Sequence, residues 1–293
     1  MTKKALVIYK KSLYQIYVQE KKNPHIAHLL AAGDVSVKEM LASHEENAKT
    51  VERVLGVLNK HGFSTRARYR GDASMVRDDT AIVFSVGGDG TFLWTQKYVG
   101  VGVPVFGVNS DPGRSVGFLC TAEKDNFEQR LTDYLQPEEQ KTFGCPTPVL
   151  LQRMKVEVNG TVIADRVLND VLFCHKNPAA MSTYFLNGES QKSSGVWVAT
   201  SAGSTGAMKS AGGTPMPWSY PSFQFRAREP YNPSGKYEFS HGFVKAGDSL
   251  HLISKMREAI IAPDGARDLH HVKMGDKITI SHSSEPLTWI KML

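Results

Sequence analysis

The sequence predicts an α/β domain with a parallel sheet, followed by a mostly antiparallel β domain. Up to about residue 143, short apolar runs alternate with helical patterns. This alternation indicates strands joined by helical crossovers, with helices on both faces of the sheet. Beyond residue 147, short β-rich runs are separated by Asn159-Gly160, Asn187-Gly188 and Asp264-Gly265. These dipeptides favour tight hairpin turns and therefore an antiparallel arrangement.

Two domains and a short tail are expected. The prolines of Cys145-Pro146-Thr147-Pro148 end the first pattern. We therefore place the α/β domain at 1–145 and the β-rich domain at 146–283. The last residues, 284–293, are expected to form a tail that packs back on the N-terminal domain.

The elements of the first domain follow from the spacing of its apolar residues. Ser43 and Glu46 fit a capping box, which predicts a helix that starts there and ends at Gly62. Residues 10–42 fit no regular element and are expected to form an irregular arm. The other expected elements are strands 5–9, 63–69, 81–86 and 103–108, and helices at about 91–98 and 123–135.

The second domain is expected to consist of short strands. Residues 214–235 are rich in proline, serine and aromatic residues, and we expect a long ordered loop there. Residues 207–211 are expected to be helical. The expected strands are 156–158, 162–173, 181–186, 196–200, 250–254, 259–262 and 277–283.

The composition is that of a soluble globular protein, with 41% hydrophobic and 22% charged residues among 293. No apolar run approaches the roughly 18 residues of a membrane span. The run 5–9 is also too short for the hydrophobic part of a signal peptide. Three widely spaced cysteines, Cys120, Cys145 and Cys174, include no C-x-x-C pair. We expect reduced thiols in a cytoplasmic protein that has no membrane partner.

The charge pattern gives weak support to nucleic-acid binding. The net charge is +6, but the basic residues are dispersed and do not alternate with aromatic residues in one tract. A modest positive field suits ligands that carry several phosphates, although a solvated surface explains it equally well. No Cys/His cluster has the spacing of a zinc site, and we expect no metal held by the protein alone.

The segment Gly87-Gly88-Asp89-Gly90-Thr91 is the strongest functional signal. It follows an apolar strand pattern and precedes a helical one. Such a glycine turn exposes backbone N–H groups and can hold phosphate. A carboxylate repels phosphate, so the presence of Asp89 in such a turn requires an explanation. Asp89 could hold Mg²⁺ or accept a proton from an attacking hydroxyl. The simpler alternative is a turn in which Asp89 caps the helix.

A second glycine cluster follows the strand pattern 196–200. The hydroxyls of Thr200, Ser201, Ser204 and Thr205 surround Gly203. They could bond a ribose, a phosphate or the N–H groups of the next helix. The pattern G-x-S-x-G is absent, which argues against a hydrolase nucleophile. The Walker pattern is absent too, so a P-loop is not supported.

The motifs together resemble the NAD kinase family. The segment 87–91 is similar to the family signature, and 108–119 is similar to its second segment in a lengthened form. Asn169-Asp170 resembles the family's Asn-acidic pair, and 203–213 resembles its third glycine-rich segment. The motifs stand in the family order over roughly 80–280, and 110–117 and 191–195 resemble the mitochondrial-type branch most.

The resemblance implies a Rossmann-like α/β domain and a C-terminal antiparallel β-sandwich, with the active site between them. It implies an ATP-dependent kinase that transfers the γ-phosphate of ATP to the 2′-hydroxyl of the adenosine ribose of NAD(H), giving NADP(H). ATP, NAD and Mg²⁺ are the expected cofactors. A homodimer is expected from the family, and no nucleic-acid partner is expected.

The resemblance also implies roles for individual residues. Asp89 is the expected proton acceptor. Asn169 and Asp170 are expected to hold a ribose or the nicotinamide end of the dinucleotide, and Ser204 and Thr205 to line the adenosine pocket. The complete set expected to bind nucleotides is Gly87, Gly88, Gly90, Thr91, Asn109, Asn169, Asp170, Ser194, Thr200, Gly203, Ser204 and Thr205.

Two alternatives remain at this stage. Lipid and sphingoid-base kinases of the same superfamily also carry a Gly-Gly-Asp-Gly turn. A dinucleotide-binding protein without catalysis is the other alternative. Two departures from the family pattern motivate this alternative. Ser194 stands where most family members have Asp, and Thr205-Gly206-Ala207 lacks the usual aromatic residue.

Overall fold

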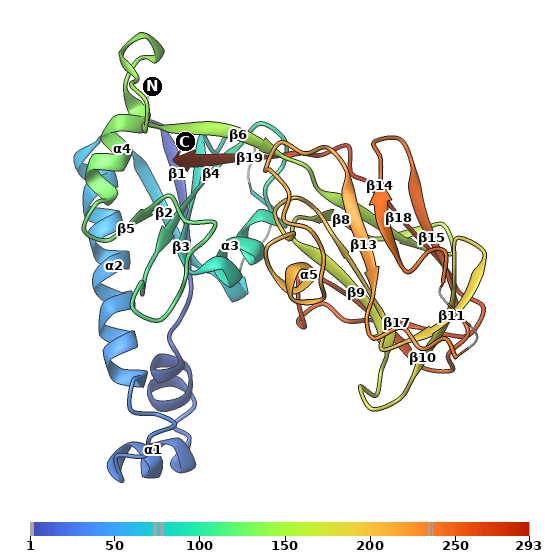
Figure 1. The fold of residues 1–293 in the computed structure, drawn as a ribbon. Coiled ribbons are helices and arrows are strands. Elements are labelled where there is room, and N and C mark those ends of the chain that lie inside the picture. The colour runs from blue at the N-terminus through green and yellow to red at the C-terminus, as the bar shows by residue number, and fades with distance from the viewer. Residues whose placement is uncertain (1–2, 73–74, 77–78, 234, 236, 293) are drawn as a thin grey trace. The chain divides into compact units, whose positions relative to one another are not determined.

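The computed structural model describes residues 3–72, 75–76, 79–233, 235 and 237–292. The outermost predicted bounds, residues 1 and 293, and residue 234 of the predicted loop lie outside the described residues. The chain divides into two compact units (Figure 1). Unit 1 comprises Met1–Val149 and Thr288–Leu293, and unit 2 comprises Leu150–Leu287.

Unit 1 is built on a sheet with the strand order β2-β1-β3-β4-β19-β6, and β5 pairs with β4 off this path. The pairs β1–β2, β1–β3, β3–β4 and β4–β19 are parallel. The carboxyl ends of β1, β3 and β4 therefore share one edge of the sheet. The strand bounds are β1 Lys4–Tyr9, β2 Ser64–Tyr69, β3 Ile82–Gly87, β4 Pro104–Asn109, β5 Ala122–Glu123, β6 Pro146–Leu151 and β19 Leu287–Met292.

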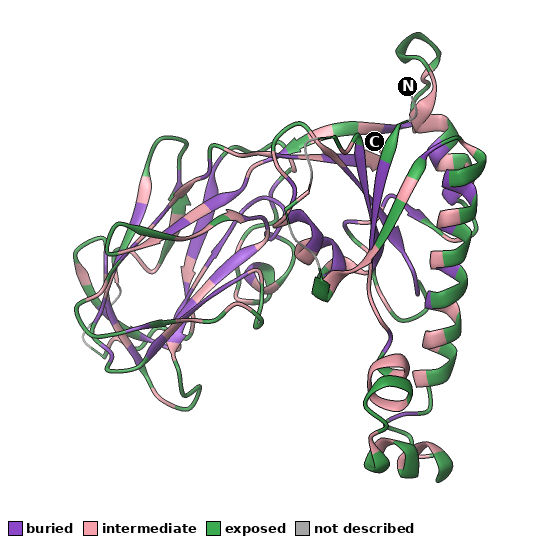
Figure 2. Cartoon of the chain, turned by 180° about the vertical axis from the view of Figure 1, so that it is seen from behind, coloured by how far each residue is buried: buried purple, intermediate pink, exposed green. Residues whose placement is uncertain are grey.

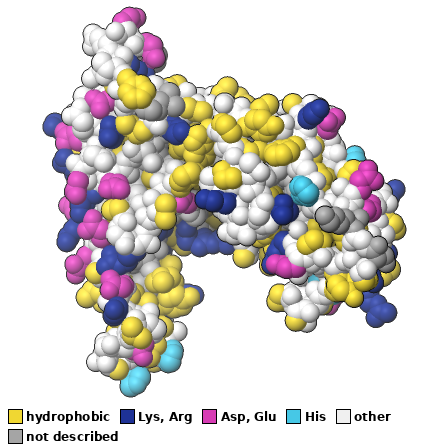
Figure 3. All heavy atoms as spheres, viewed as in Figure 1, with side chains coloured by type: hydrophobic (Ala, Val, Ile, Leu, Met, Phe, Trp, Pro, Cys, Tyr) yellow, Lys and Arg dark blue, Asp and Glu magenta, His cyan; other side chains and the backbone are white. Residues whose placement is uncertain are grey.

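Helices cover both faces of this sheet (Figure 1). On one face, α2 and α4 pack Val54 and Leu131 against Phe84 and Phe106. Figure 2 shows the buried inner side of α2 and its exposed outer side, and Figure 3 shows charges of both signs on that outer side. The bounds are α1 Pro24–Ala31, α2 Met40–Lys60, α3 Asp89–Gln96 and α4 Phe127–Leu135, with shorter helices at Gln15–Glu20, Arg70–Asp72 and Glu138–Gln140.

Three predictions for unit 1 were wrong. The expected irregular arm contains Gln15–Glu20 and α1, whose start is capped by Asn23. Ser43 does not begin a helix, because α2 starts at Met40 and the Ser43 hydroxyl donates to Asp111 instead. The helix expected from residue 123 starts at Phe127, because Glu123 ends β5 and residues 124–126 form a turn.

The described residues of unit 2 form two antiparallel sheets. Their orders are β11-β10-β15-β18-β7-β8 and β14-β13-β12-β9-β16-β17. The core takes Phe173 and Ile261 from one sheet and Tyr184 and Leu252 from the other. The bounds are β7 Met154–Val158, β8 Thr161–Val167, β9 Asp170–His175, β10 Ser182–Leu186, β11 Glu189–Ser193, β12 Val196–Ala199, α5 Ala207–Ser210, β13 Phe223–Ala227, β14 His241–Val244, β15 Ser249–Ser254, β16 Ala259–Pro263, β17 His270–Val272 and β18 Lys277–His282.

The predicted fold class, an α/β unit with a parallel sheet and a β-rich antiparallel unit, is confirmed. Two details of unit 2 were wrong. The strand expected over 162–173 is divided into β8 and β9, because the backbone leaves the ladder at Leu168-Asn169. The expected loop 214–235 contains β13, which buries Phe223 and Phe225. Among the helices that the structure describes, none combines the length and the apolar character needed to cross a membrane.

Candidate active site

The first glycine cluster forms the turn between β3 and α3, as the sequence predicts. Two of its glycines are fixed by contacts. A Cβ on Gly87 would lie 2.2 Å from Oγ1 of Thr91, and a Cβ on Gly88 would lie 2.2 Å from Oγ of Ser115. Gly90 faces open space instead. The turn is therefore closed on two sides and open at Gly90, where the first N–H groups of α3 lack acceptors within the helix.

The carboxylate of Asp89 is held by backbone donors. The N–H of Phe118 donates to Oδ2 at 3.0 Å, and the N–H of Leu119 donates to Oδ1 at 2.7 Å. Both oxygens thus have a fixed donor, which sets the orientation of the side chain. Asp89 is half-buried and remains accessible from one side.

The loop that supplies these donors is itself anchored. Asn109 at the end of β4 donates from Nδ2 to the carbonyl of Ser115 at 2.9 Å. Gly117 has φ +64°, and a Cβ there would lie 2.4 Å from Nδ2 of Asn109. Behind the loop, Nε1 of Trp289 donates to the carbonyl of Leu119 at 3.0 Å. Asn109 therefore acts on the Asp89 site through the shape of the loop.

The lengthened part of this loop is tied to α2. Asp111 is buried and accepts from the Ser43 hydroxyl at 2.6 Å and from Nη1 of Arg114 at 2.9 Å. Arg114 also pairs with Glu39 at 2.5 Å. The contacts with Ser43 and Glu39 connect residues 68 and 75 positions apart in the sequence, so the motif alone could not indicate them.

Two cations beside the turn were missed by the sequence analysis. Lys10 directly follows β1, and its N–H donates to the carbonyl of Val86 at 3.2 Å. Arg70 follows β2, and its Nη1 donates to Oγ1 of Thr91 at 3.3 Å. A parallel sheet with β3 beside β1 brings both strand ends to the glycine turn, which spacing in the sequence does not reveal.

In unit 2, Asn169 and Asp170 lie at the start of β9, next to Asp264. Asp264 accepts from the N–H groups of Leu168, Asn169 and Asp170, at 3.0, 2.7 and 3.3 Å. Nδ2 of Asn169 donates to Oδ2 of Asp170 at 2.8 Å. The sequence analysis took Asp264 for a simple turn residue. It is in a turn with φ +51°, but it also fixes the backbone of the Asn-acidic pair.

Burial and the neighbouring Asp264 carboxylate raise the pKa of Asp170 to about 7, and the hydrogen bond from Asn169 opposes this only in part. Burial disfavours the charged form, and so does a second negative charge nearby. Asp170 therefore carries a proton for part of the time at neutral pH. A protonated carboxyl can donate a hydrogen bond to a ligand as well as accept one.

The second glycine cluster forms a tight turn after β12. A Cβ on Gly203 would lie 2.0 Å from the carbonyl oxygen of Asn169, so this turn packs directly on the Asn-acidic pair. The Thr200 hydroxyl donates to the carbonyl of Leu168, and the Ser204 hydroxyl donates to that of Ser201 at 2.7 Å. Both side chains are buried and shape the turn, whereas Thr205 is exposed.

The structure thus brings the predicted residues into two groups. Ser194 joins neither of them. It precedes β12, whose register pairs Val196 with Phe173 and Ala199 with Asp170. Ser194 therefore lies at the opposite end of β12 from Thr200 and the Asn-acidic pair. The group in unit 1 is Gly87, Gly88, Asp89, Gly90, Thr91 and Asn109, and the group in unit 2 is Asn169, Asp170, Thr200, Gly203, Ser204 and Thr205.

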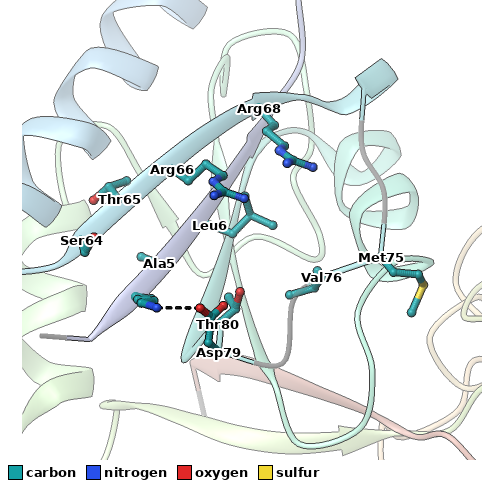
Figure 4. A pocket seen from close by; sticks show the side chains of 11 residues that line it. Ala5, Leu6, Ser64, Thr65, Arg66, Arg68, Met75, Val76, Asp79 and Thr80 are labelled. Atoms are coloured by element: carbon teal, nitrogen blue, oxygen red, sulfur yellow. Dashed lines mark hydrogen bonds and ion pairs between the residues drawn. The ribbon is translucent and has the colours of Figure 1, made fainter. Parts of the chain in front are cut away.

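Unit 1 has a cavity of about 390 Å³ (Figure 4). Arg66 and Arg68 of β2 line it, together with Lys4, which forms an ion pair with Asp79 at 2.6 Å. It contains none of the predicted site residues. Over the described part of the chain, no cluster of three or more His, Cys, Asp or Glu side chains could hold a metal ion.

Comparison with known proteins identifies the family. A family model described as the ATP-NAD kinase N-terminal domain matches residues 8–139. A protein of Oryza sativa subsp. japonica described as a probable NADH kinase is 35% identical over 259 residues, covering 80% of this chain and 78% of the relative. The chain belongs to the NAD kinase family. The NADH kinase of Arabidopsis thaliana is 34% identical to this chain, and the match covers 79% of each chain.

Solved structures of NAD kinases share the fold. An NAD kinase from Archaeoglobus fulgidus in complex with ATP matches 99% of this chain and 94% of its own, with a TM-score of 0.64 at 22% identity. Yeast NADH kinase complexed with NADH matches 100% of this chain and 84% of its own, with a TM-score of 0.66 at 15% identity. The resemblance read from the four motifs is confirmed, and the lipid-kinase alternative is not favoured.

Proposed function

We propose that this protein is an NAD(H) kinase in which Asp89 accepts the proton of the 2′-hydroxyl of the adenosine ribose. The observation that carries this assignment is the pair of backbone N–H groups, from Phe118 and Leu119, that orient the Asp89 carboxylate at the glycine turn. The reaction class, phosphoryl transfer from ATP to NAD(H), is that of the family to which the chain belongs.

The proposed step is a single displacement. The 2′-oxygen forms a bond to the γ-phosphorus of ATP, the bond to the bridging oxygen breaks, and ADP leaves. The hydroxyl proton passes to Asp89. Phosphoryl transfer depends mostly on positioning and charge stabilisation, so a carboxylate that is already oriented suits this role.

The donor phosphates are assigned to the glycine turn. Gly87 and Gly88 leave no room for side chains, and Gly90 is open. Mg²⁺ fits this site, because it is usually held by one or two carboxylates together with substrate phosphates, and Asp89 provides such a carboxylate. When bound with ATP, Mg²⁺ neutralises charge on the phosphates.

The acceptor dinucleotide is assigned to the group in unit 2. Asn169 and Asp170 together offer an amide and a partly protonated carboxyl to ribose hydroxyls. The exposed Thr205 and the Gly203 turn contribute to the adenosine pocket, while Thr200 and Ser204 shape it from within. We further propose a cytoplasmic homodimer without nucleic-acid or membrane partners.

A donor-by-acceptor activity matrix tests the function. The purified chain is incubated with Mg²⁺ and either ATP or polyphosphate, and with either NAD or NADH, and NADP(H) is measured. Formation of NADP(H) with ATP is expected. Phosphorylation of diacylglycerol vesicles without NADP(H) would favour a lipid kinase. Tight NAD(H) binding by calorimetry with no turnover from any donor would favour the non-catalytic alternative.

A further inference from the structure

Lys10 occupies a fixed position at the carboxyl edge of the parallel sheet. Its N–H donates to the carbonyl of Val86, directly before the glycine turn, at 3.2 Å. Its own carbonyl accepts from Nδ2 of the buried Asn47 in α2 at 3.1 Å. The backbone of Lys10 is therefore held from both sides, and its side chain starts beside Gly87.

The ammonium group of Lys10 is half-buried, and within the described part of the chain it makes no hydrogen bond or ion pair. Burial lowers its pKa, the nearby Arg70 lowers it further, and Asp111 opposes them. Asp111 cannot serve as a dedicated partner, because its oxygens already bind Ser43 and Arg114. A partly desolvated cation beside a second cation is costly unless an anion joins them.

Arg70 reaches the same turn from the next strand end. Its guanidinium donates to Oγ1 of Thr91, the last residue of the glycine motif. Its carbonyl accepts from Nε1 of Trp94, one turn further along α3. Arg70 is thus attached to α3 by both its side chain and its backbone, with its charge next to the first turn of that helix.

We propose that Lys10 and Arg70 bind the phosphates of the donor nucleotide at the glycine turn. This inference rests on the proposed function, since it assigns residues to the donor side of the same reaction. The glycine turn supplies N–H groups but also the negative charge of Asp89. Two cations at its border offset that charge and attract a polyphosphate chain.

Lys10 and Arg70 can contact the phosphates in different ways. A lysine ammonium acts as a mobile point charge, whereas an arginine guanidinium donates two parallel hydrogen bonds to phosphate oxygens. Charge builds up on the leaving ADP during phosphoryl transfer, and cations already in place stabilise it without reorganisation. Loss of either cation should therefore weaken ATP binding and slow turnover.

Nucleotide binding by charge-neutral variants tests the proposal. Lys10→Gln and Arg70→Gln are compared with matched controls, Lys11→Gln and Arg66→Gln. Lys11 follows Lys10 but is ion-paired with Glu20 at 2.8 Å, and Arg66 lies on β2 away from the turn. Affinities for Mg-ATP and for adenosine are measured by calorimetry, with the thermal midpoint recorded for each variant.

We expect Lys10→Gln and Arg70→Gln to lose about ten- to hundredfold in ATP affinity, as charge-assisted hydrogen bonds are lost. Adenosine affinity, KM for the dinucleotide and the thermal midpoint should stay at the values of the controls. Lys10→Arg, which keeps the charge, should retain ATP affinity within a fewfold.

Unchanged ATP affinity in both charge-neutral variants would overturn the proposal. An equal loss for ATP and adenosine, or a lowered thermal midpoint, would show a structural role and overturn it as well. Failure of the kinase assignment would give a different experimental result from failure of this inference. A wild-type chain that binds ATP in a Lys10-dependent manner but forms no NADP(H) would support this inference while refuting the proposed function.

Discussion

In each of the two candidate groups an aspartate lies beside a glycine turn. The two groups differ in which aspartate accepts the backbone N–H groups. In unit 1, the carboxylate proposed to accept the proton takes the backbone donors itself, because Asp89 accepts from Phe118 and Leu119. In unit 2, Asp264 takes three backbone donors, and Asp170 is left buried beside it. The first arrangement orients a carboxylate, whereas the second raises the pKa of one.

This difference matches the chemistry proposed for each group. A proton acceptor has to keep its geometry while a negatively charged phosphate chain is close by. A group that binds sugar hydroxyls benefits from both donor and acceptor capacity, which a carboxyl near its pKa provides. The environment of an aspartate, and not its residue type, therefore decides what it can do.

The largest effect is expected for Asp89→Asn. An amide cannot accept the proton, so the rate of NADP(H) formation should fall by about 10²- to 10⁴-fold. Circular dichroism should change little and the thermal midpoint should fall only slightly, because Oδ1 of the amide still accepts from the loop while its nitrogen cannot replace the second acceptor. Retention of more than a tenth of the wild-type rate would remove Asp89 from the proposed role.

Within the same turn, Gly87→Ala and Gly90→Ala test how the packing around each glycine affects the free energy of unfolding. A Cβ on Gly87 collides with Thr91, so this variant should lose roughly 2–3 kcal/mol of unfolding free energy. Gly90→Ala meets open space at a helical position and should be as stable as the wild type or slightly more stable. Urea denaturation measures both. Equal stability of the two variants would contradict the described turn.

In unit 2, Asp264→Ala should weaken dinucleotide binding more than ATP binding. Three N–H groups lose their acceptor, which costs about 1–3 kcal/mol for each one that stays buried and releases the backbone of the Asn-acidic pair. Asp276→Ala is the matched control, since Asp276 also accepts a backbone N–H, from Lys273 at 2.7 Å, in another turn. KM for NAD(H) should rise for the Asp264 variant alone. Asp264→Asn, which keeps an acceptor, should recover part of the loss.

The effect expected from Asp170→Asn is the one that depends on pH. The pKa of Asp170 is raised from 3.8 to about 7, so the folded chain holds a proton that the unfolded chain releases earlier. Its contribution to stability is complete below pH 4 and is lost as the pH rises to about 7. Asp170→Asn should therefore gain stability relative to the wild type as the pH rises from 4 to 8, by at most about 4 kcal/mol for a rise of about three pKa units. A stabilisation confined to low pH would contradict a raised pKa.

The sequence predicted what depends on neighbours along the chain. Both glycine turns and the strand and helix around Asp89 follow from local spacing, whereas the Asn-acidic pair was implied by the resemblance to the family. Asp264 was missed because the pairing of β16 with β9 places it beside the Asn-acidic pair, where its hydrogen bonds join residues 94 to 96 positions apart. Lys10 was missed because only the strand order β2-β1-β3 brings it beside the turn.

Long-range contacts also explain the errors in the expected elements. Ser43 looked like a capping residue, but its hydroxyl binds Asp111 across 68 positions. The loop expected at 214–235 contains β13 because Phe223 and Phe225 pack into the core of unit 2. Local patterns could not anticipate a partner that only the folded chain supplies.

The last strand, β19, has a consequence for the order in which the protein matures. It pairs with β4, and its Trp289 binds the carbonyl of Leu119, whose N–H holds Asp89. During translation, β19 leaves the ribosome only after every other residue of the sheet has been synthesised. The nascent chain therefore lacks support for the loop that holds Asp89 until β19 has been synthesised, and truncation before Leu287 should abolish the proposed activity although the residues of the glycine turn are all present.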